Sequence, residues 1–212
     1  MTISTVEKVL DAAEHLIHRR GYDGFSMADL VSASGVSNGS VYHHFGTKDG
    51  VLGALLLRVV ENYQNSILIV LDDHPDDPEQ TVHAIVTTHL QWTESHPRQA
   101  KMLLEYRHVV TAQPYRRRLQ ALNHAFLDRH TSWLQAQVRA GRIPDVDIEA
   151  AHAMVFAPAQ ELSRRWLTQR STRPPTQFAS VLGAGAWAAM SAANKTIDVR
   201  PNGEPVERPA KN

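Results

Sequence analysis

Polar side chains crowd one short stretch of the chain, NGSVYHHF at residues 38–45. Val41 points inward if this stretch is helical, so a helix here has little to bury and its outward side needs an explanation. That side presents short or planar hydrogen-bond donors and acceptors: Asn38, Ser40, Tyr42, His43 and His44. Such groups fit the base edges and phosphate oxygens of a DNA major groove. The alternative is a polar helix surface that faces water.

Two short helices joined by the turn SGVS would position this stretch. Ser26 is suited to capping the first helix and Ser37 to capping the second. Gly35 suits the turn, because a side chain there would clash at positive φ. Val36 and Val41 would fix the angle between the two helices. The pattern predicts a helix-turn-helix, a shape that serves both DNA binding and purely structural roles.

The remaining chain is predicted to be helical as well, which makes the fold class all-α. A first helix is expected from about Ser4 to Arg20, ended by Gly21 in a left-handed conformation. Thr47 should cap a long apolar helix from about Lys48 to Leu71, and Pro78 suits the first turn of the next one. Later helices are expected at about 79–95, 98–110, 115–140, 147–170 and 176–195, followed by a disordered polar tail at 196–212.

Composition narrows the class of protein. With no cysteine, the chain forms no disulfide and no thiolate metal site, as suits a reducing cytoplasm. The N-terminus lacks the features of a signal peptide, and no run of about eighteen apolar residues occurs. The sequence therefore predicts a soluble cytoplasmic protein without a membrane partner.

Charge gives no sign of a nucleic-acid partner. Lys and Arg together number 22, as do Asp and Glu, so the net charge is zero. DNA-binding modules usually show a basic footprint. Within residues 1–50, the acidic side chains outnumber the basic ones: Glu7, Asp11, Glu14, Asp23, Asp29 and Asp49 against Lys8, Arg19, Arg20 and Lys48.

Twelve histidines raise the question of a metal site or an enzyme. His124 and His130 are six residues apart, which places them on different faces of a helix. His15 and His18 share a face but have no third ligand nearby in the sequence. Phosphate-binding, nucleophile-elbow and zinc-protease motifs are missing. We therefore expect no metal, no cofactor and no catalysis.

The stretch FSMADLVSASGVSNGSVYHHFGTKDGVLGALL, residues 25–56, resembles the DNA-binding domain of TetR-family transcriptional regulators. The resemblance covers roughly residues 5–55 and rests on the capped short helix, the G-V-S turn and the positions that follow. Those positions are Ser40, Tyr42, His44, Phe45, Lys48 and Leu52. The resemblance implies a helix-turn-helix domain at residues 1–50 and a helical ligand-binding and dimerisation domain at 51–195.

The resemblance also implies roles for individual residues. Ser26 and Ser37 would cap helices and touch phosphates. Asn38 and Ser40 would face bases, with His43 near them. Tyr42, His44 and Lys48 would hold the DNA backbone.

As a whole, the resemblance implies a repressor that binds a palindromic double-stranded operator as a homodimer and releases it on binding a small molecule. The alternative is a helical module whose C-terminal half binds a partner protein.

Two C-terminal helices are the candidates for the dimer interface. The last one is rich in Ala, Gly and Ser, and a face of small residues lets another helix come close. Pro158 inside the preceding helix should kink it. By the resemblance these helices pair with their symmetry mates, although burial within one subunit is the alternative. The expected interface residues are Val155, Leu162, Trp166, Phe178, Leu182, Gly185, Trp187 and Met190.

The middle helices are candidates for the walls of a ligand pocket. His89, Asn123 and His130 interrupt apolar stripes and would orient a largely apolar or aromatic ligand. Each also suits the role of a core residue with its hydrogen bonds satisfied. The full set of expected ligand contacts is His89, Trp92, Met102, Tyr106, Asn123, Phe126, His130, Trp133, Phe156 and Gln160.

Overall fold

The computed structural model describes residues 4–73, 76–106 and 114–192, and these are helical apart from short connections. The predicted all-α fold is confirmed. The elements are α1 (Thr5–Arg20), α2 (Met27–Ser34), α3 (Asn38–Phe45), α4 (Lys48–Asp73), α5 (Pro78–Ser95), α6 (Pro97–Tyr106), α7 (Tyr115–Arg139), α8 (Ile148–Leu167), the 3₁₀ turn η1 (Pro175–Phe178) and α9 (Ala179–Ala192).

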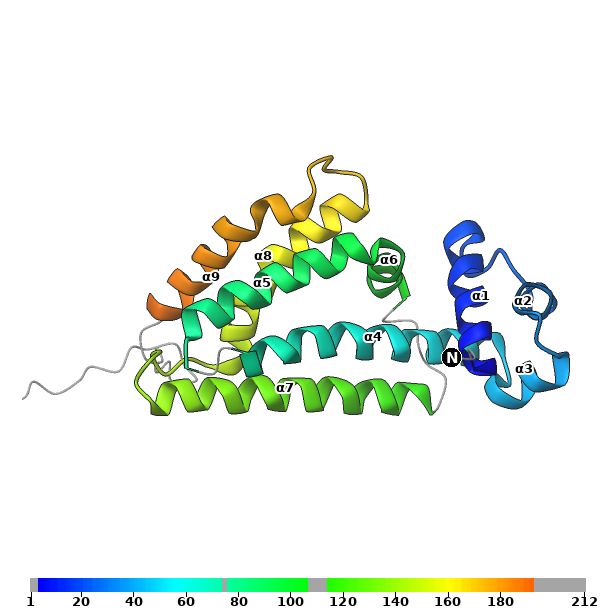
Figure 1. Ribbon diagram of the computed structural model, residues 1–212, viewed down its shortest axis with the longest axis horizontal. Coiled ribbons are helices and arrows are strands. Elements are labelled where there is room, and N and C mark those ends of the chain that lie inside the picture. The colour runs from blue at the N-terminus through cyan, green and yellow to red at the C-terminus, as the bar shows by residue number, and fades with distance from the viewer. Residues whose placement is uncertain (1–3, 74–75, 107–113, 193–212) are drawn as a thin grey trace, which may run out of the picture.

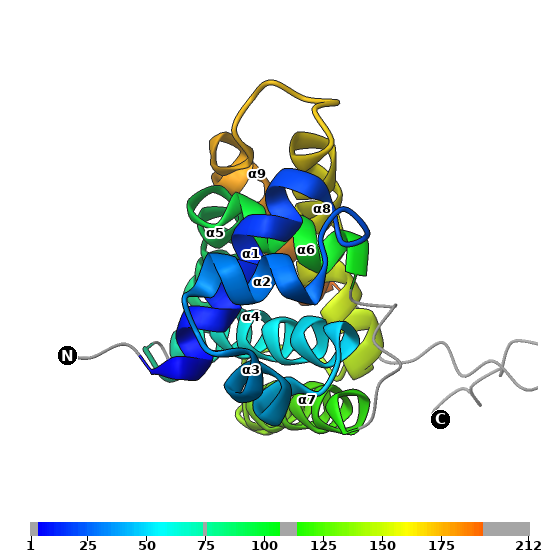
Figure 2. The same cartoon turned by 90° about the vertical axis from the view of Figure 1, so that its right-hand side faces the viewer.

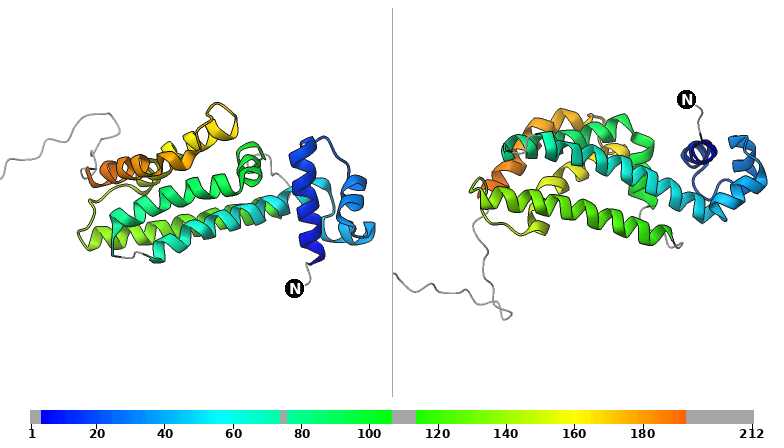
Figure 3. Two further views of the ribbon diagram at one scale, coloured as in Figure 1. Left: turned by 45° about the horizontal axis from the view of Figure 1, so that its top comes forward. Right: turned by 60° about the horizontal axis from the view of Figure 1, so that its bottom comes forward.

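The first three helices form a unit at one end of an elongated molecule (Figure 1). Helix α4 leaves this unit and runs beside α7 through the larger part of the molecule (Figure 3). Helices α5, α8 and α9 pack against one another on the other side of α4. Viewed from the α1–α3 end, α2 and α3 stand in front of the larger bundle (Figure 2). One long helix therefore connects both parts.

Helix ends agree closely with the local signals in the sequence. Ser26 and Asp29 form a reciprocal capping box at the start of α2. Gly35 ends that helix at φ 64° and ψ 16°, in the left-handed region. The hydroxyl of Ser37 accepts the N–H of Ser40 at 3.3 Å. The hydroxyl of Thr47 likewise caps α4, since it accepts the N–H of Gly50 at 3.1 Å.

Some expectations about the ends need correction. Gly21 has φ 71° but ψ 169°, so it is extended with positive φ rather than left-handed helical. The helix expected at 176–195 begins as the 3₁₀ turn η1, and α9 starts at Ala179. Pro158 lies inside helix α8 as expected, and the kink expected there stays a prediction. Residues 107–110, 193–195 and the tail at 196–212 lie outside the described residues.

Apolar side chains form separate clusters around α4. One joins α1, α2 and α3 to the first half of α4, with Val9, Leu30, Val41 and Leu55 fully buried. A second gathers the far half of α4 with α5, α7, α8 and α9 around Ile67 and Leu90. Because both clusters include α4, this helix is part of each core.

Helix α4 is also the one helix among the described residues with the length and hydropathy of a membrane span. Its apolar side chains are covered by other helices: Leu55, Leu56, Val59 and Ile67 are fully buried. Core helices meet the same criteria of length and composition, and we assign α4 to the core.

Candidate DNA-binding surface and ligand cavity

Helix α3 turns its polar residues outward as predicted. Val41 and Phe45 are buried, at 0% and 7% exposure, and hold the helix against the domain. Tyr42 is 46% exposed, a large fraction for an aromatic ring. Asn38, His43 and His44 are also exposed, and Ser40 is half-buried. The outward face therefore combines an aromatic hydroxyl, an amide and two imidazoles, which suits contacts with a nucleic-acid groove.

Lys48 is held within the domain. Its Nζ donates to the carbonyl oxygen of Phe25 at 2.6 Å. The ammonium also lies 4.5 Å from the ring centre of Tyr22 and 4.4 Å from that of Phe25. Lys48 thus connects the start of α4 to the loop before α2. Its expected contact with a phosphate stays a prediction, and a Lys48→Ala variant would disturb this connection too.

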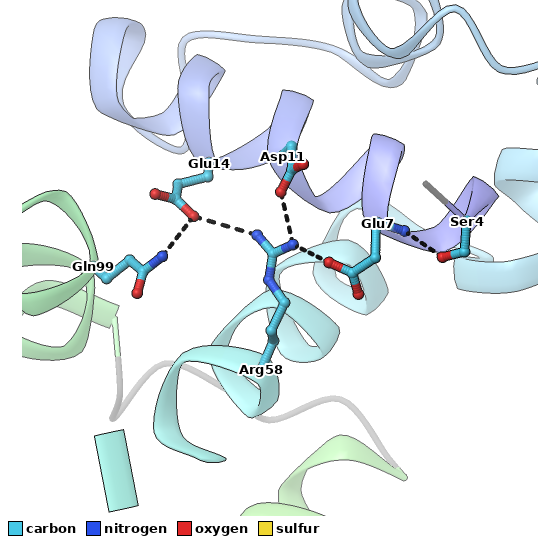
Figure 4. A network of polar contacts seen from close by, with 6 residues as sticks. All are labelled: Ser4, Glu7, Asp11, Glu14, Arg58 and Gln99. Atoms are coloured by element: carbon cyan, nitrogen blue, oxygen red, sulfur yellow. Dashed lines mark hydrogen bonds and ion pairs between the residues drawn. The ribbon is translucent and has the colours of Figure 1, made fainter. Parts of the chain in front are cut away.

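The acidic side chains of α1 face α4 and meet an arginine there (Figure 4). One guanidinium nitrogen of Arg58 donates to Glu7 at 2.6 Å and to Asp11 at 2.8 Å. The other donates to Glu14 at 3.3 Å. Glu14 also accepts from Gln99 of α6 at 3.2 Å. The cluster joins α1, α4 and α6, so these carboxylates serve the junction between the two parts of the chain.

Two further acids of the N-terminal domain have structural partners. Asp29 accepts from the backbone and hydroxyl of Ser26, and these hydrogen bonds lower the pKa of its carboxyl. Asp49 accepts from the hydroxyl of Tyr22. Helix α3 itself contains no acidic residue. Most acidic side chains within residues 1–50 therefore cap a helix or join α1 to α4 and α6, and none of them lies on α3.

Two adjoining cavities lie between α4, α5, α6, α7 and α8. The first has a volume of about 320 Å³ and is walled by α4, α7 and α8, with Leu103 from α6. The second, of about 410 Å³, lies between α4, α5, α6 and α8. Tyr63, Leu103 and Gln160 line both. The size and the mostly apolar, aromatic lining are typical of a small-molecule site.

The predicted ligand residues divide between these cavities. Asn123, Phe126, Phe156 and Gln160 line the first, and His89, Trp92 and Gln160 the second. Asn123 accepts from Gln64 at 2.9 Å. Sequence reasoning missed Tyr63, Gln64, Leu103, His152 and Ser163. Tyr63 and Gln64 could have been found, because they interrupt the apolar pattern of the long helix.

Four of the expected contacts lie elsewhere: His130 and Trp133 line a separate cavity of about 30 Å³, and Met102 and Tyr106 lie on α6. Met102 is 3% exposed and packs with the N-terminal cluster. The hydroxyl of Tyr106 accepts the backbone N–H of Tyr22 at 3.4 Å, and the two rings pack together. Both residues lie where α6 meets the end of α1, and neither lines the two adjoining cavities. Helical spacing does not distinguish the side of α6 that faces the cavity from the side that faces α1.

His89 has hydrogen-bond partners on both ring nitrogens. Its Nδ1 lies 2.8 Å from the hydroxyl of Tyr63, and its Nε2 lies 3.2 Å from the hydroxyl of Ser163. Ser163 also donates to Thr93 at 3.3 Å. Burial lowers the pKa of His89 to about 4, so the ring is neutral at pH 7. The interpretation of His89 as a core histidine with satisfied hydrogen bonds is confirmed, beside a cavity that it helps to line.

The arrangement agrees with comparisons to known proteins. A model of the family "Bacterial regulatory proteins, tetR family" matches residues 9–55. The repressor KstR2 of Rhodococcus jostii is 28% identical over 173 residues, 79% of each chain. The fold resembles FadR of Bacillus halodurans with a TM-score of 0.72 at 18% identity, covering 88% of this chain and 96% of that one. FadR of Bacillus subtilis, in complex with stearoyl-CoA, gives 0.69 at 16% identity, covering 86% and 98%.

Residues 9–55 therefore form a DNA-binding domain of the TetR type, and the described residues have the fold of solved TetR-family regulators. The similarity to transcriptional regulators supports the expectation of a DNA-binding regulator that is not an enzyme. The family model matches most of α1, the helix-turn-helix formed by α2 and α3, and the first turns of α4.

This TetR-family domain should bind DNA with an unusually weak dependence on salt. Helix α3 carries no Lys or Arg, and Lys48 is already hydrogen-bonded within the domain. Each phosphate neutralised by a cation adds about −0.9 to the slope of log K against log salt. We expect a slope shallower than about −4 per dimer. Fluorescence anisotropy at several salt concentrations measures it, and a slope implying about eight or more neutralised phosphates would contradict the expectation.

The regulator should lose stability in mild acid through His89. In the unfolded chain this ring takes up a proton near its ordinary pKa of 6.5, whereas in the folded protein burial delays protonation to about pH 4. The unfolded state therefore binds more protons between these values, and stability falls as the pH falls through that window, by roughly 3 kcal/mol at most. Urea unfolding at pH 7 and pH 4.5 measures the loss. His89→Gln should reduce the pH dependence, whereas the exposed control His124→Gln should retain it.

The α8–α9 surface differs in part from the predicted interface. Val155 and Met190 are 7% and 1% exposed and belong to the subunit's own core. Leu162, Trp166, Phe178, Leu182 and Trp187 are half-buried, and Gly185 is exposed. On α9 the exposed positions are mainly small: Ser180, Ala184, Gly185, Ala188 and Ala189, beside Val181 at 65% exposure. On α8, Ala153, Ala157 and Pro158 are exposed together with the larger polar residues Glu149, Gln160, Glu161 and Arg165. Val155 and Met190 are therefore removed from the set of interface residues.

Proposed function

We propose that the protein is a homodimeric repressor that holds a palindromic operator through α3 and releases it when a small, largely apolar molecule fills the adjoining cavities. The observation that carries this proposal is the course of α4. Its first turns pack on α3 through Val51 and Leu52, and Tyr63 and Gln64 of the same helix line a cavity. A ligand that shifts α4 therefore acts on the DNA-binding domain through one rigid element.

The exposed polar face of α3 supports the DNA-binding part of the proposal. We propose that Asn38 and Ser40 face bases, with His43 near them, and that Tyr42 and His44 contact the backbone. Ser26 and Ser37 would cap their helices and touch phosphates. These helix N-termini would contribute much of the phosphate binding, because α3 has no cationic side chain.

The small-residue face of α8 and α9 supports the dimer. Alanine and glycine let helices from two subunits approach closely, and an exposed apolar face of this kind is typical of an interface. Two α3 helices related by a two-fold axis would bind half-sites one or more DNA turns apart. A ligand that favours a dimer with different spacing would then lower operator affinity, to the extent that it binds the two states differently.

The two cavities support an effector with an apolar body. Their walls include the rings of Tyr63, Trp92, Phe126 and Phe156. Polar side chains lie beside these rings: Gln64, Asn123, Glu149, His152 and Gln160 in the first cavity, and His89, Thr93, Gln160, Glu161, Ser163 and Arg164 in the second. The stearoyl-CoA complex of Bacillus subtilis FadR shows that one protein of similar fold binds a ligand with a long apolar chain. Because operator DNA is the proposed partner, we place the protein in the cytoplasm.

A mobility-shift assay with the DNA upstream of the protein's own gene tests the proposal. Specific retardation is expected with the wild-type chain and is expected to be lost in Tyr42→Ala. Ala136→Ser, an exposed substitution on α7, serves as the control. Addition of effector candidates to the retarded complex should release the DNA. Retardation that is equal in wild type and Tyr42→Ala, and that is competed equally by unrelated DNA, would contradict the proposal.

A further inference from the structure

The 320 Å³ cavity contains a buried amide oxygen that is accessible to a ligand. Gln64 of α4 lines this cavity and is 6% exposed. Its amide nitrogen donates to the side-chain oxygen of Asn123 at 2.9 Å, the one side-chain hydrogen bond of Gln64 within the described part of the chain. Gln64 Oε1 has no partner there, and yet it is not one of the unpartnered side-chain atoms that are closed to water. The oxygen therefore opens toward the cavity, where it accepts a hydrogen bond from a ligand that donates one.

The charges around this cavity favour a positively charged group. Glu149 of α8 lines it, and its carboxylate forms no ion pair with another described residue. No Lys or Arg is among the described residues of its walls. The 410 Å³ cavity has Arg164, whose guanidinium is paired with Glu161 at 2.8 and 2.7 Å. An anionic group in the 320 Å³ cavity would therefore meet a carboxylate and no available cation, whereas a cation would be stabilised.

Aromatic rings complete the site. Tyr63 of α4, Phe126 of α7 and Phe156 of α8 line the same cavity. The ring centres of Phe126 and Phe156 are 6.5 Å apart, with 57° between the ring planes. The face of an aromatic ring carries partial negative charge, so it attracts a cation. Taking a cation out of water is costly, and the rings, the oxygen of Gln64 and the carboxylate of Glu149 together offset that cost.

Gln64 distinguishes this arrangement from an ordinary acid at the start of a helix. Glu149 is exposed and lies in the first turn of α8, where the helix dipole stabilises any carboxylate. The dipole accounts for Glu149 by itself, but it does not account for a buried amide in the middle of the apolar helix α4. A few polar groups placed among apolar and aromatic walls are what orients a ligand in a small-molecule site.

We propose that the 320 Å³ cavity binds the ammonium group of an organic amine. The ammonium donates to Gln64 Oε1, lies against the aromatic rings and is balanced by the carboxylate of Glu149. The apolar body of the amine continues into the 410 Å³ cavity, which shares Tyr63 and Leu103 with the first and adds Trp92. The effector is accordingly a lipophilic amine, and this inference rests on the effector role proposed for the adjoining cavities.

Matched small molecules test this site on the full-length protein. The probes are 4-phenylbutylamine, the neutral 4-phenylbutan-1-ol and the anionic 4-phenylbutanoate, which share a phenyl ring and a short alkyl chain. Binding is measured by titration calorimetry at about pH 8, where primary amines are protonated and imidazoles are neutral. The amine should bind about tenfold or more tighter than the alcohol, and the carboxylate should bind most weakly. The side-chain amide ¹H–¹⁵N signals of Gln64 should move on addition of the amine.

Glu149→Gln tests the role of the charge. This variant should reduce the amine's advantage over the alcohol to less than about threefold. Glu79→Gln is the matched control, because Glu79 also lies in the first turn of a helix, α5, but lines neither cavity. Both variants remove an acid from a helix start and should lose a similar amount of stability in urea. A loss of amine preference in Glu149→Gln alone therefore belongs to the cavity.

Gln64→Met tests the hydrogen bond. Methionine keeps an unbranched side chain and removes the acceptor. The amine and the alcohol both donate to Oε1, so both should bind about tenfold more weakly. Butylbenzene donates nothing and should bind as it does to the wild type, which controls for a change in packing. The trimethylammonium analogue of the amine carries the charge without an N–H group, so it should respond to Glu149→Gln but not to Gln64→Met.

Several results would overturn the amine site. They are equal binding of amine and alcohol, carboxylate binding tighter than either, an advantage of the amine that survives Glu149→Gln, amine binding that leaves the Gln64 signals unchanged, and no amine binding up to its solubility limit. Operator release by the same probes is measured separately. Release at equal concentrations of amine and butylbenzene would retain the effector cavity and reject the amine site. Amine binding at this site without any release at saturation would retain the amine site and reject the repressor.

Discussion

Replacing Ala184 of α9 by arginine is expected to turn the proposed dimer into a monomer and to lower operator affinity by about 10²-fold or more. Ala184 lies in the exposed small-residue face of α9, and in the proposed dimer the close approach of two helices there would leave no room for a long side chain. A charge buried there without a partner would also be strongly unfavourable. A monomer keeps one α3 and loses the gain in affinity that comes from linking two half-site contacts.

Sedimentation velocity gives the oligomeric state of the Ala184→Arg variant, and fluorescence anisotropy gives its operator affinity. Ala136→Arg is the matched control, because Ala136 is likewise an exposed helical alanine but lies on α7. That control should remain a dimer with wild-type affinity. An Ala184→Arg protein that stays dimeric would place the interface on another face of the molecule.

Replacing Gly50 by alanine is expected to destabilise the protein by about 3 kcal/mol. Gly50 is buried in the first turn of α4, and a Cβ atom there would lie 2.0 Å from the carbonyl oxygen of Phe45. The obstacle is backbone, so the end of α3 and the start of α4 would have to move apart. Because this junction orients α3, operator affinity should fall together with stability.

Gly39→Ala is the control for Gly50→Ala. Both glycines lie in helices, but a Cβ atom at Gly39 meets nothing within 4 Å. The folded domain should therefore gain up to about 1 kcal/mol from the better helix propensity of alanine. Urea unfolding of both variants gives the comparison. Equal stability of Gly50→Ala and the wild type would show that the α3–α4 junction is not as tightly packed as the structure indicates.

The helix-turn-helix could be predicted almost to the residue, because its signals are local. Ser26, Gly35, Ser37 and Thr47 act on backbone groups within four residues of themselves, and each lies where its capping role requires. The outward face of α3 could be predicted for the same reason, since a helix this short has few residues to bury. Local sequence signals suffice for the helix-turn-helix because the hydrogen bonds that end its helices join residues close together in the sequence.

The ion-pair junction of α1, α4 and α6 and the proposed interface on α8 and α9 depend on contacts that no local sequence pattern specifies. Arg58 is 51 residues from Glu7 along the sequence, and no local pattern pairs them. Sequence composition alone therefore made the N-terminal domain look too acidic for DNA. On α8 and α9, apolar spacing identifies a face that is covered but not whether the same subunit or a partner covers it. Large residues such as Met190 are buried in the subunit, and small ones such as Ala184 are left exposed.

The residues of the ligand cavity could be predicted from the sequence only in part. His89 and Asn123 could be predicted as polar groups within apolar stripes, and both line a cavity. Tyr63 and Gln64 were missed because the helix at about Lys48–Leu71 was predicted from its apolar residues alone, and its polar residues were not assigned to a cavity wall. Their position is what makes α4 the physical link between a ligand and α3.

Selection of DNA by the purified protein from a pool of random duplexes tests the central claim most directly. The account predicts enrichment of a two-fold symmetric sequence whose half-sites are separated by one or more DNA turns, and loss of that enrichment with Tyr42→Ala. An unenriched pool with the folded wild-type protein would contradict sequence-specific binding through α3. The helical C-terminal part would then be better explained as a binding surface for a partner protein.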